Sequence, residues 1–152
     1  MKDQDSFEYV KELFTEYLLK HHHRKTPERY AILERIFMYE QHFTVEMLYN
    51  QMKDSFRVSL ATIYNTIDLL LECNLIVKHL LGGQLAQYEK VSGLNTHHHL
   101  ICTRCGKVKE FSDKQIRTSI QSKQFAHFQL SHYSLYLYGL CSKCQAELKN
   151  QK

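Results

Sequence analysis

Four of the five cysteines in this 152-residue chain occur as two Cys-x-x-Cys pairs, Cys102/Cys105 and Cys141/Cys144. A Cys-x-x-Cys turn directs both sulfurs toward one centre, and two such pairs supply the four thiolates of a tetrahedral structural zinc site. Four unlinked thiols and a redox-active pair are the alternatives, and the presence of two matched pairs favours zinc. The sequence therefore predicts a closed zinc site that stabilises a small fold and leaves no coordination position open for catalysis.

Composition fits a globular protein with a core of its own, because 43% of the residues are hydrophobic. No run of about 18 apolar residues is present, which excludes a membrane-spanning helix. Residues 1–6 lack the basic-then-apolar pattern of a signal peptide, so we expect a cytoplasmic protein. A reducing compartment in turn favours zinc ligands over disulfides for the cysteine pairs. The fifth cysteine, Cys73, lies in an apolar helical pattern and is predicted to be a small buried residue.

The charge is distributed unevenly along the chain. The net charge of +4 weakly favours an anionic partner. Residues 1–90 carry 11 Lys and Arg against 13 Asp and Glu, whereas residues 91–152 carry 9 against 3. Bulk charge therefore does not identify a nucleic-acid surface, and only local clusters of basic side chains can do so.

The first half of the chain has the pattern of helices followed by a hairpin. Apolar residues at helical spacing predict helices that begin near residues 7, 27, 45 and 60, with Thr26, Thr44 and Ser59 as N-caps. Residues 75–81 and 84–89 predict two strands joined by a Gly82-Gly83 turn. This order predicts a winged helix-turn-helix, and a helical bundle with an appended hairpin is the alternative.

The second half predicts a small α/β domain. Strands are expected at residues 98–102 and 107–111, and residues 127–140 are strand-like and rich in aromatic side chains. Capping boxes at Ser112–Gln115 and Ser142–Gln145 predict the starts of two helices. The predicted fold class is thus α+β, with a winged helix-turn-helix domain over residues 1–90 and a dimerisation and metal-binding domain over residues 91–152.

A histidine cluster directly precedes the first cysteine pair and predicts a second metal site. Side chains alternate along a strand, so His97 and His99 share one face and His98 faces away. Two imidazoles at this spacing can bind one metal together with further ligands. The candidates are Glu89 at the end of the hairpin and Glu110 on the partner strand, with His42 as an isolated third candidate. Spacing alone does not connect these three residues to the histidine pair.

The fourth helix is the DNA reader in a winged helix-turn-helix. Its polar face includes Ser59, Thr62, Tyr64 and Asn65; Tyr64 suits a thymine methyl group and Asn65 suits an adenine edge. Phosphate contacts are expected from four basic residues, Arg24, Lys25, Arg29 and Arg57. A winged helix that binds protein instead of DNA is the alternative, because residues 1–90 are net acidic.

These features together resemble the ferric uptake regulator family of metal-responsive repressors. The resemblance runs from about residue 26 to residue 144. It depends on Ser59-Leu-Ala-Thr-Ile-Tyr-Asn65, on Gly82-Gly83, on His97-His-His-Leu-Ile-Cys-Thr-Arg-Cys105 and on Ser134-Leu-Tyr-Leu-Tyr-Gly-Leu-Cys141. It implies a cytoplasmic homodimer that binds a pseudo-palindromic operator, and not an enzyme.

By position, the four paired cysteines match the structural zinc ligands. The positions that match the regulatory metal ligands at the hinge between the domains are His42, Glu89, His97, His99 and Glu110.

Departures from common family patterns narrow the choice of metal. Peroxide sensors of the family usually have aspartates where Glu89 and Glu110 stand, and zinc sensors usually include a cysteine, so the resemblance favours Fe²⁺ or Mn²⁺ with Zn²⁺ as an alternative. A further metal site of many members is predicted to be absent, because its positions hold Thr96, His98, Arg117 and Tyr133; His98 or His132 could at most bind metal weakly. A manganese, zinc or peroxide sensor of the same family is the nearest alternative function. A zinc-dependent hydrolase is the alternative from another class, but the chain lacks an H-E-x-x-H arrangement.

Overall fold

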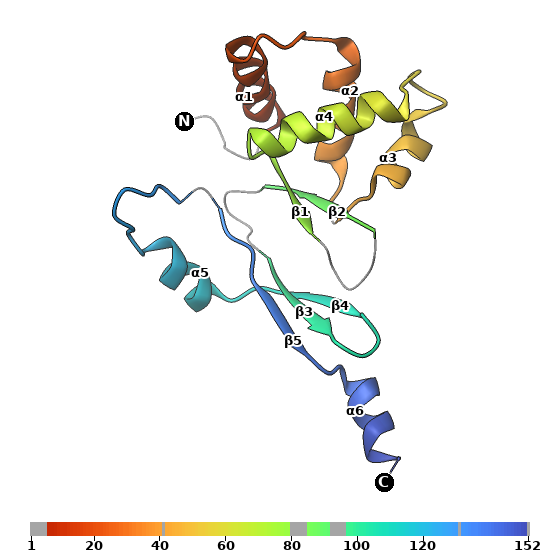
Figure 1. The fold of residues 1–152 in the computed structure, drawn as a ribbon, viewed down its shortest axis with the longest axis vertical. Helices are drawn as coiled ribbons and strands as arrows, with labels where there is room; N and C mark the ends of the chain where they lie inside the picture. The colour runs from red at the N-terminus through yellow and green to blue at the C-terminus, as the bar shows by residue number, and fades with distance from the viewer. Residues whose placement is uncertain (1–5, 41, 80–84, 92–96, 131, 152) are drawn as a thin grey trace. The chain divides into compact units, whose positions relative to one another are not determined.

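The structure is a computed structural model that describes residues 6–40, 42–79, 85–91, 97–130 and 132–151. The chain separates into two compact units (Figure 1). Unit 1 contains the described residues up to His79 together with residues 85–91, and unit 2 contains the described residues from His97 onward. No helix among these described ranges is both long and apolar enough to cross a membrane.

Unit 1 begins with four helices, and each starts at a side-chain cap. The helices are α1 (Phe7–Lys20), α2 (Pro27–Met38), α3 (Val45–Met52) and α4 (Leu60–Glu72). The hydroxyls of Ser6, Thr26, Thr44 and Ser59 accept the backbone N–H three residues further on, which satisfies a donor that the first helical turn leaves unpaired. Pro27 occupies the first position of α2, where its missing N–H is not needed. The four helices expected from the apolar periodicity are therefore present.

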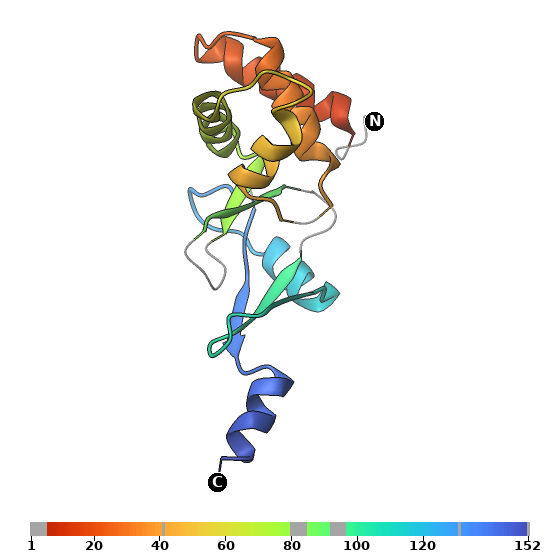
Figure 2. The same ribbon diagram turned by 90° about the vertical axis from the view of Figure 1, so that its right-hand side faces the viewer.

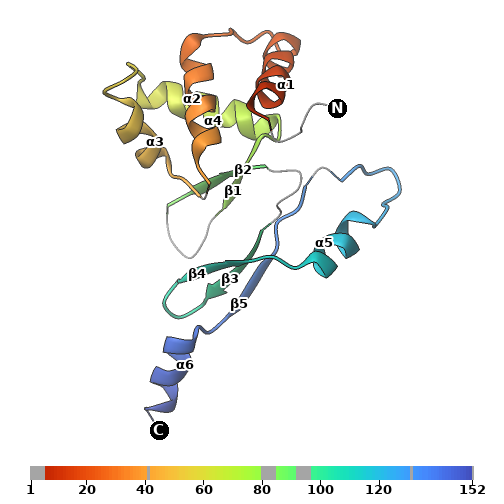
Figure 3. The same cartoon turned by 180° about the vertical axis from the view of Figure 1, so that it is seen from behind.

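The core of unit 1 forms where α2 contacts each of the other three helices, an arrangement visible in Figure 3. Each helix contributes a side chain that is at most 1% exposed: Phe14 from α1, Ile36 from α2, Leu48 from α3 and Ile67 from α4. Burying a side chain of this size stabilises the folded state by roughly 1.5–3 kcal/mol. The packing therefore fixes α3 and α4 as a helix-turn-helix on the scaffold of α1 and α2.

A β-hairpin completes unit 1. Strands β1 (Ile76–His79) and β2 (Gln87–Lys90) pair antiparallel and follow α4 (Figure 2). Phe43, just before α3, forms an isolated antiparallel bridge with Tyr88 through two backbone hydrogen bonds of 2.9 and 2.8 Å. The described strands are shorter than predicted, and the expected Gly82-Gly83 turn lies outside the described residues. Helices α2–α4 with this hairpin form the predicted winged helix-turn-helix.

Unit 2 has a three-stranded sheet in the order β4-β3-β5. Strand β3 (His98–Cys102) pairs antiparallel with β4 (Val108–Phe111) and parallel with β5 (Tyr136–Gly139). Helix α5 (Lys114–Gln121) follows β4, and α6 (Ser142–Lys149) directly follows β5. Since β3 ends at Cys102 and β5 ends just before Cys141, the parallel pairing brings both cysteine pairs to one end of the sheet.

Three expectations for unit 2 were wrong in detail. The N-cap of α5 is Asp113 rather than Ser112, because the Asp113 carboxylate accepts the N–H of Ile116 at 3.0 Å. The N-cap of α6 is Cys141, which makes no side-chain capping bond because its sulfur faces the other cysteines. Within the described part of residues 127–140, the strand covers only Tyr136–Gly139. For the two helix starts, the Asp113 acceptor and the cysteine cluster outweigh the pattern read from the sequence.

Candidate metal centres and nucleic-acid interface

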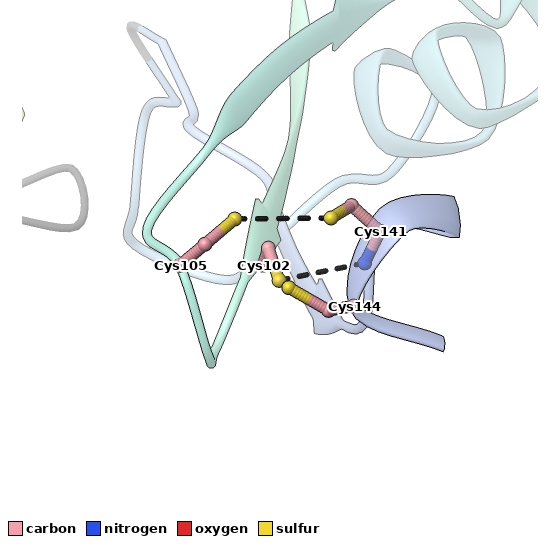
Figure 4. Close-up of side chains that lie close together, drawn as sticks. All are labelled: Cys102, Cys105, Cys141 and Cys144. Atoms are coloured by element: carbon pink, nitrogen blue, oxygen red, sulfur yellow. Dashed lines mark hydrogen bonds between the residues drawn. The ribbon is translucent and has the colours of Figure 1, made fainter. Parts of the chain in front are cut away.

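The four paired cysteines converge at the end of the unit 2 sheet (Figure 4). Their sulfurs all lie within 4.8 Å of one another, and the Sγ atoms of Cys105 and Cys141 are 3.7 Å apart. In a tetrahedral site with zinc–sulfur bonds of about 2.3 Å, neighbouring sulfurs lie about 3.8 Å apart. The four thiols thus already have the spacing and the donor chemistry that zinc requires.

The electrostatics of the cluster lower the pKa of two thiols, Cys102 and Cys141, and oppose a full set of thiolates. Backbone N–H groups of Cys105 and Cys141 donate to the Cys102 sulfur and lower the pKa of that thiol to about 6. Burial and the adjoining sulfurs of Cys141 and Cys102 raise the pKa of Cys144 to about 12. A bound dication stabilises all four thiolates together, because its charge removes their mutual repulsion.

A second group of metal-ligand side chains lies within unit 1 and consists of His42, His79 and Glu89. The Phe43–Tyr88 bridge places His42 beside Glu89, since residues adjacent to an antiparallel pair also lie opposite one another. The β1–β2 register pairs Val77 with Glu89, so His79 lies diagonally across from Glu89 on the same face of the hairpin. Backbone pairing alone therefore brings the three side chains together.

The three side chains are hydrogen-bonded through a single carboxylate oxygen. Nε2 of His42 and Nε2 of His79 each lie 3.0 Å from Oε2 of Glu89. The His79 side chain is 2% exposed and the Glu89 side chain 16%. Burial opposes ionisation of Glu89, but the hydrogen bonds from the two imidazoles outweigh it and hold the pKa of Glu89 well below its usual range. The group thus presents an ionised carboxylate and two imidazoles, which suits a divalent cation.

Unit 2 carries its own set of predicted regulatory ligands. His99 on β3 is paired with Glu110 on β4, so both side chains lie on the same face of the sheet. His99 is 2% exposed and packs against the ring of Tyr136 at 5.5 Å, while His97, two residues earlier, is half-buried. The structure therefore places His99 with Glu110 in unit 2 and His42 with Glu89 in unit 1.

His79 belongs to the unit 1 group but was missed by the sequence prediction. It lies within residues 75–81, which were expected to form a strand. Its proximity to Glu89 depends on the register of the hairpin, which is not given by the residue pattern. The available signal was a histidine near the end of one predicted strand and a glutamate at the end of the next.

The positions of the additional family site carry a different contact. His98 is fully buried, its Nε2 lies 2.9 Å from the Tyr133 hydroxyl, and its ring packs against Phe111. Burial also raises the pKa of Tyr133. His132 is half-buried, and Thr96 lies outside the described residues. The absence of a metal at these positions stays a prediction, and the His98–Tyr133 hydrogen bond agrees with it.

The predicted DNA-reading side chains lie on the solvent side of α4. Ile63, Ile67 and Leu70 point into the core, whereas Tyr64 is 51% exposed and Asn65 is exposed beside it. The hydroxyls of Ser59 and Thr62 are 2.9 Å apart at the start of the helix. The exposed face of α4 is thus free of core contacts and presents donors, acceptors and one aromatic ring.

The predicted phosphate-contacting residues lie at two places on unit 1. Arg24 and Lys25 are exposed in the segment between α1 and α2, and the Arg29 guanidinium donates to the backbone carbonyl of Arg24. Arg57 is exposed two residues before the cap of α4. Both positions put positive charge close to the N-terminal end of a helix, where it can meet a phosphate.

Comparison with known proteins identifies the family. The sequence profile described as the ferric uptake regulator family matches residues 20–138. A ferric uptake regulation protein of Campylobacter upsaliensis is 33% identical over 129 residues, which cover 82% of this chain and 81% of that protein. The chain belongs to the ferric uptake regulator family. The peroxide-responsive repressor PerR of Staphylococcus aureus (strain USA300) is 28% identical over 124 residues, covering 80% of this chain and 82% of the repressor.

A solved structure supports the same assignment. The ferric uptake regulator from Pseudomonas aeruginosa with manganese aligns with a TM-score of 0.67 at 28% identity, covering 84% of this chain and 97% of that chain. Proteins of the ferric uptake regulator family are dimeric, metal-responsive transcription regulators. The chain is accordingly a DNA-binding regulator and not an enzyme, so the hydrolase alternative is excluded.

Proposed function

We propose that this regulator binds zinc at Cys102, Cys105, Cys141 and Cys144, and that a separate divalent ion controls its affinity for DNA. The 3.7 Å sulfur spacing and the pairing of β3 with β5 support the zinc assignment. Four thiolates leave no free coordination position, so this ion supplies stability to unit 2 and no reactivity. A reducing cytoplasm would keep the four thiols available for it.

The two units have different tasks in this proposal. Residues 1–90 carry the winged helix-turn-helix and bind DNA through α4, with Tyr64 and Asn65 at base edges, Ser59 and Thr62 beside them, and the four basic residues on phosphates. Residues 91–152 form the homodimer. A dimer with twofold symmetry would place two copies of α4 in successive major grooves of a pseudo-palindromic operator.

The regulatory ion is proposed to be bound by His42 and Glu89 of unit 1 together with His97, His99 and Glu110 of unit 2. The observation that supports this is the convergence, within each unit, of the side chains expected to share the site. Residues of both units bound to one ion would restrict the orientation of the winged helix relative to the dimer. Moving that equilibrium from 1:99 to 99:1 requires about 5.5 kcal/mol of differential binding, which multidentate chelation can supply.

Nitrogen and carboxylate oxygen donors favour Fe²⁺ or Mn²⁺ as the regulatory ion. Zn²⁺ binds the same donors more tightly in the Irving–Williams order, so metal availability in the cell contributes to the choice. The relatives leave the alternatives of the same family open, since one is a ferric uptake regulation protein and another a peroxide-responsive repressor. Release of DNA on addition of peroxide to the metal-loaded protein would identify a peroxide sensor.

The test uses the full-length zinc-loaded protein and an operator isolated by selection from random DNA. Affinity for that operator is measured anaerobically with and without Fe²⁺ or Mn²⁺, for the unmodified chain and for His97→Ala/His99→Ala. We expect metal to increase affinity only in the unmodified chain, with bound zinc equal in both proteins. An unchanged metal response in the variant would show that these histidines do not belong to the switch.

A further inference from the structure

The unit 1 group contains one imidazole more than the proposed function uses. His79 ends strand β1 and is 2% exposed, which makes it more buried than His42 at 13% and Glu89 at 16%. A buried polar side chain needs a hydrogen-bond or ligand partner, because its desolvation is otherwise uncompensated. His79 and His42 meet the same Glu89 oxygen, and their rings lie 5.1 Å apart at 72°.

The spacing of these donor atoms is that of ligands on one ion. Both Nε2 atoms lie 3.0 Å from Oε2 of Glu89, and the three donor atoms lie within 4.8 Å of one another. Two ligands at right angles with metal–ligand bonds of about 2.1 Å are separated by about 3.0 Å. The two hydrogen bonds therefore hold three donors at ligand separation before any ion is present. An entering ion would replace the hydrogen-bonding proton on each Nε2 nitrogen, with little movement of the side chains.

We propose that His79 is a ligand of the regulatory metal, so that unit 1 contributes a three-donor half-site of His42, His79 and Glu89. This inference rests on the proposed function, because it adds a ligand to the same site. It also gives unit 1 a weak affinity of its own for divalent cations, which the unit 2 ligands strengthen. Two imidazoles and one carboxylate form a donor set that several divalent transition metals accept.

A positioning role for His79 is the competing interpretation and makes a different prediction. In that role its Nε2–H only holds the Glu89 carboxylate, and any side chain with an N–H donor at that place would suffice. A glutamine can donate the same hydrogen bond but lacks the imidazole nitrogen that transition metals prefer. His79→Gln therefore separates a ligand from a positioning residue, and it retains a polar partner for Glu89 where His79→Ala does not.

The experiment titrates Co²⁺ into full-length zinc-loaded protein and follows visible absorption and affinity for the unmodified chain, His79→Ala, His79→Gln and the control His21→Gln. His21 is an exposed histidine of the same unit, outside the group. We expect both His79 variants to lose at least about tenfold in Co²⁺ affinity and to change the absorption spectrum, with the control unchanged. A His79→Gln protein with the affinity and spectrum of the unmodified chain would overturn the proposal, whatever the state of His79→Ala.

Failure of the proposed function gives a different result in the same titration. If the regulatory site is not at this place at all, Glu89→Gln and His42→Ala bind Co²⁺ like the unmodified chain. If only the inference about His79 is wrong, those two variants lose affinity while His79→Gln does not.

Discussion

The cysteine cluster and the histidine–glutamate groups are both sets of metal-ligand side chains, but they are built differently. The cysteines come from two short turns in one unit, and each turn supplies two donors that are three residues apart. The histidine and glutamate side chains come from five separate places in the chain and are divided between two units. A site built from local turns within one unit can only stabilise that unit, whereas a site whose ligands belong to two units can connect their positions.

The two regions also differ in how readily their acidic side chains ionise without a metal ion. The thiols of the cysteine cluster oppose full ionisation until a cation arrives, since the pKa of Cys144 is raised to about 12. In unit 1, by contrast, Glu89 is held ionised by two imidazoles without any cation. In the proposed assignment, the first region would depend on its ion for its charge balance, while the second would be able to release an ion without collapse. This difference is what a structural and an exchangeable site require.

The largest effect is expected from removing a cysteine ligand. Cys105→Ser should lose the bound zinc, and unit 2 should no longer unfold cooperatively, because a structural zinc contributes to folding directly. Zinc content by mass spectrometry and hydrogen exchange across residues 97–130 and 132–151 measure the effect. Cys73→Ser is the matched control: Cys73 is half-buried in unit 1, where burial raises its pKa to about 11, and the substitution should leave zinc content unchanged. Equal zinc in Cys105→Ser would contradict the assignment.

A smaller effect should follow from removing a regulatory ligand. His99→Ala is expected to weaken Mn²⁺ or Co²⁺ binding by about 10- to 100-fold while zinc content and unit 2 folding stay intact. Competition titration against a chelator of known affinity gives the measurement. His127→Asn is a suitable control, because His127 is exposed and asparagine tolerates its φ of 57°. Loss of zinc in His99→Ala would show that the two sites are not independent.

Removing a base-reading side chain should affect DNA alone. Asn65→Ala is expected to weaken operator binding by about 1–3 kcal/mol, because a bidentate contact to adenine is lost, with both metal affinities unchanged. Fluorescence anisotropy with the metal-loaded protein measures it, at fixed salt. Asn50→Ala on the exposed side of α3 serves as the matched substitution. Equal losses for the two variants would argue against α4 as the reader.

The smallest effect concerns the pH dependence of unit 1. Because the pKa of Glu89 is lowered in the folded protein, its ionised form stabilises unit 1 above the ordinary value of 4.5, and that stability is lost as the pH falls further. Without regulatory metal, acidification from pH 7 to pH 3 should therefore destabilise the unmodified chain more than Glu89→Gln. Hydrogen exchange in α2 and α4 reports the difference, with Glu46→Gln, an exposed residue of α3, as control. Identical pH profiles would mean that Glu89 is not held ionised by the two histidines.

The comparison also explains which features the sequence could predict. The cysteine cluster follows from spacing, and the helices of unit 1 follow from apolar periodicity and the caps at Thr26, Thr44 and Ser59. The place of His42 beside Glu89 depends on a bridge between residues 43 and 88, which no local pattern encodes. His79 was missed for the same reason, since only the hairpin register aligns it with Glu89. Contacts that arise from strand register can be predicted only when the backbone pairing is known, because the order of residues does not specify it.

The central claim is that one ion is bound by side chains of both units. The most direct test counts regulatory-metal equivalents per chain, beyond zinc, in the unmodified protein, His42→Ala and His99→Ala. We predict one equivalent in the unmodified chain and loss of that same equivalent at matched metal concentration in either variant. Two equivalents in the unmodified chain, with one retained at full affinity in each variant, would show two separate sites and contradict the account.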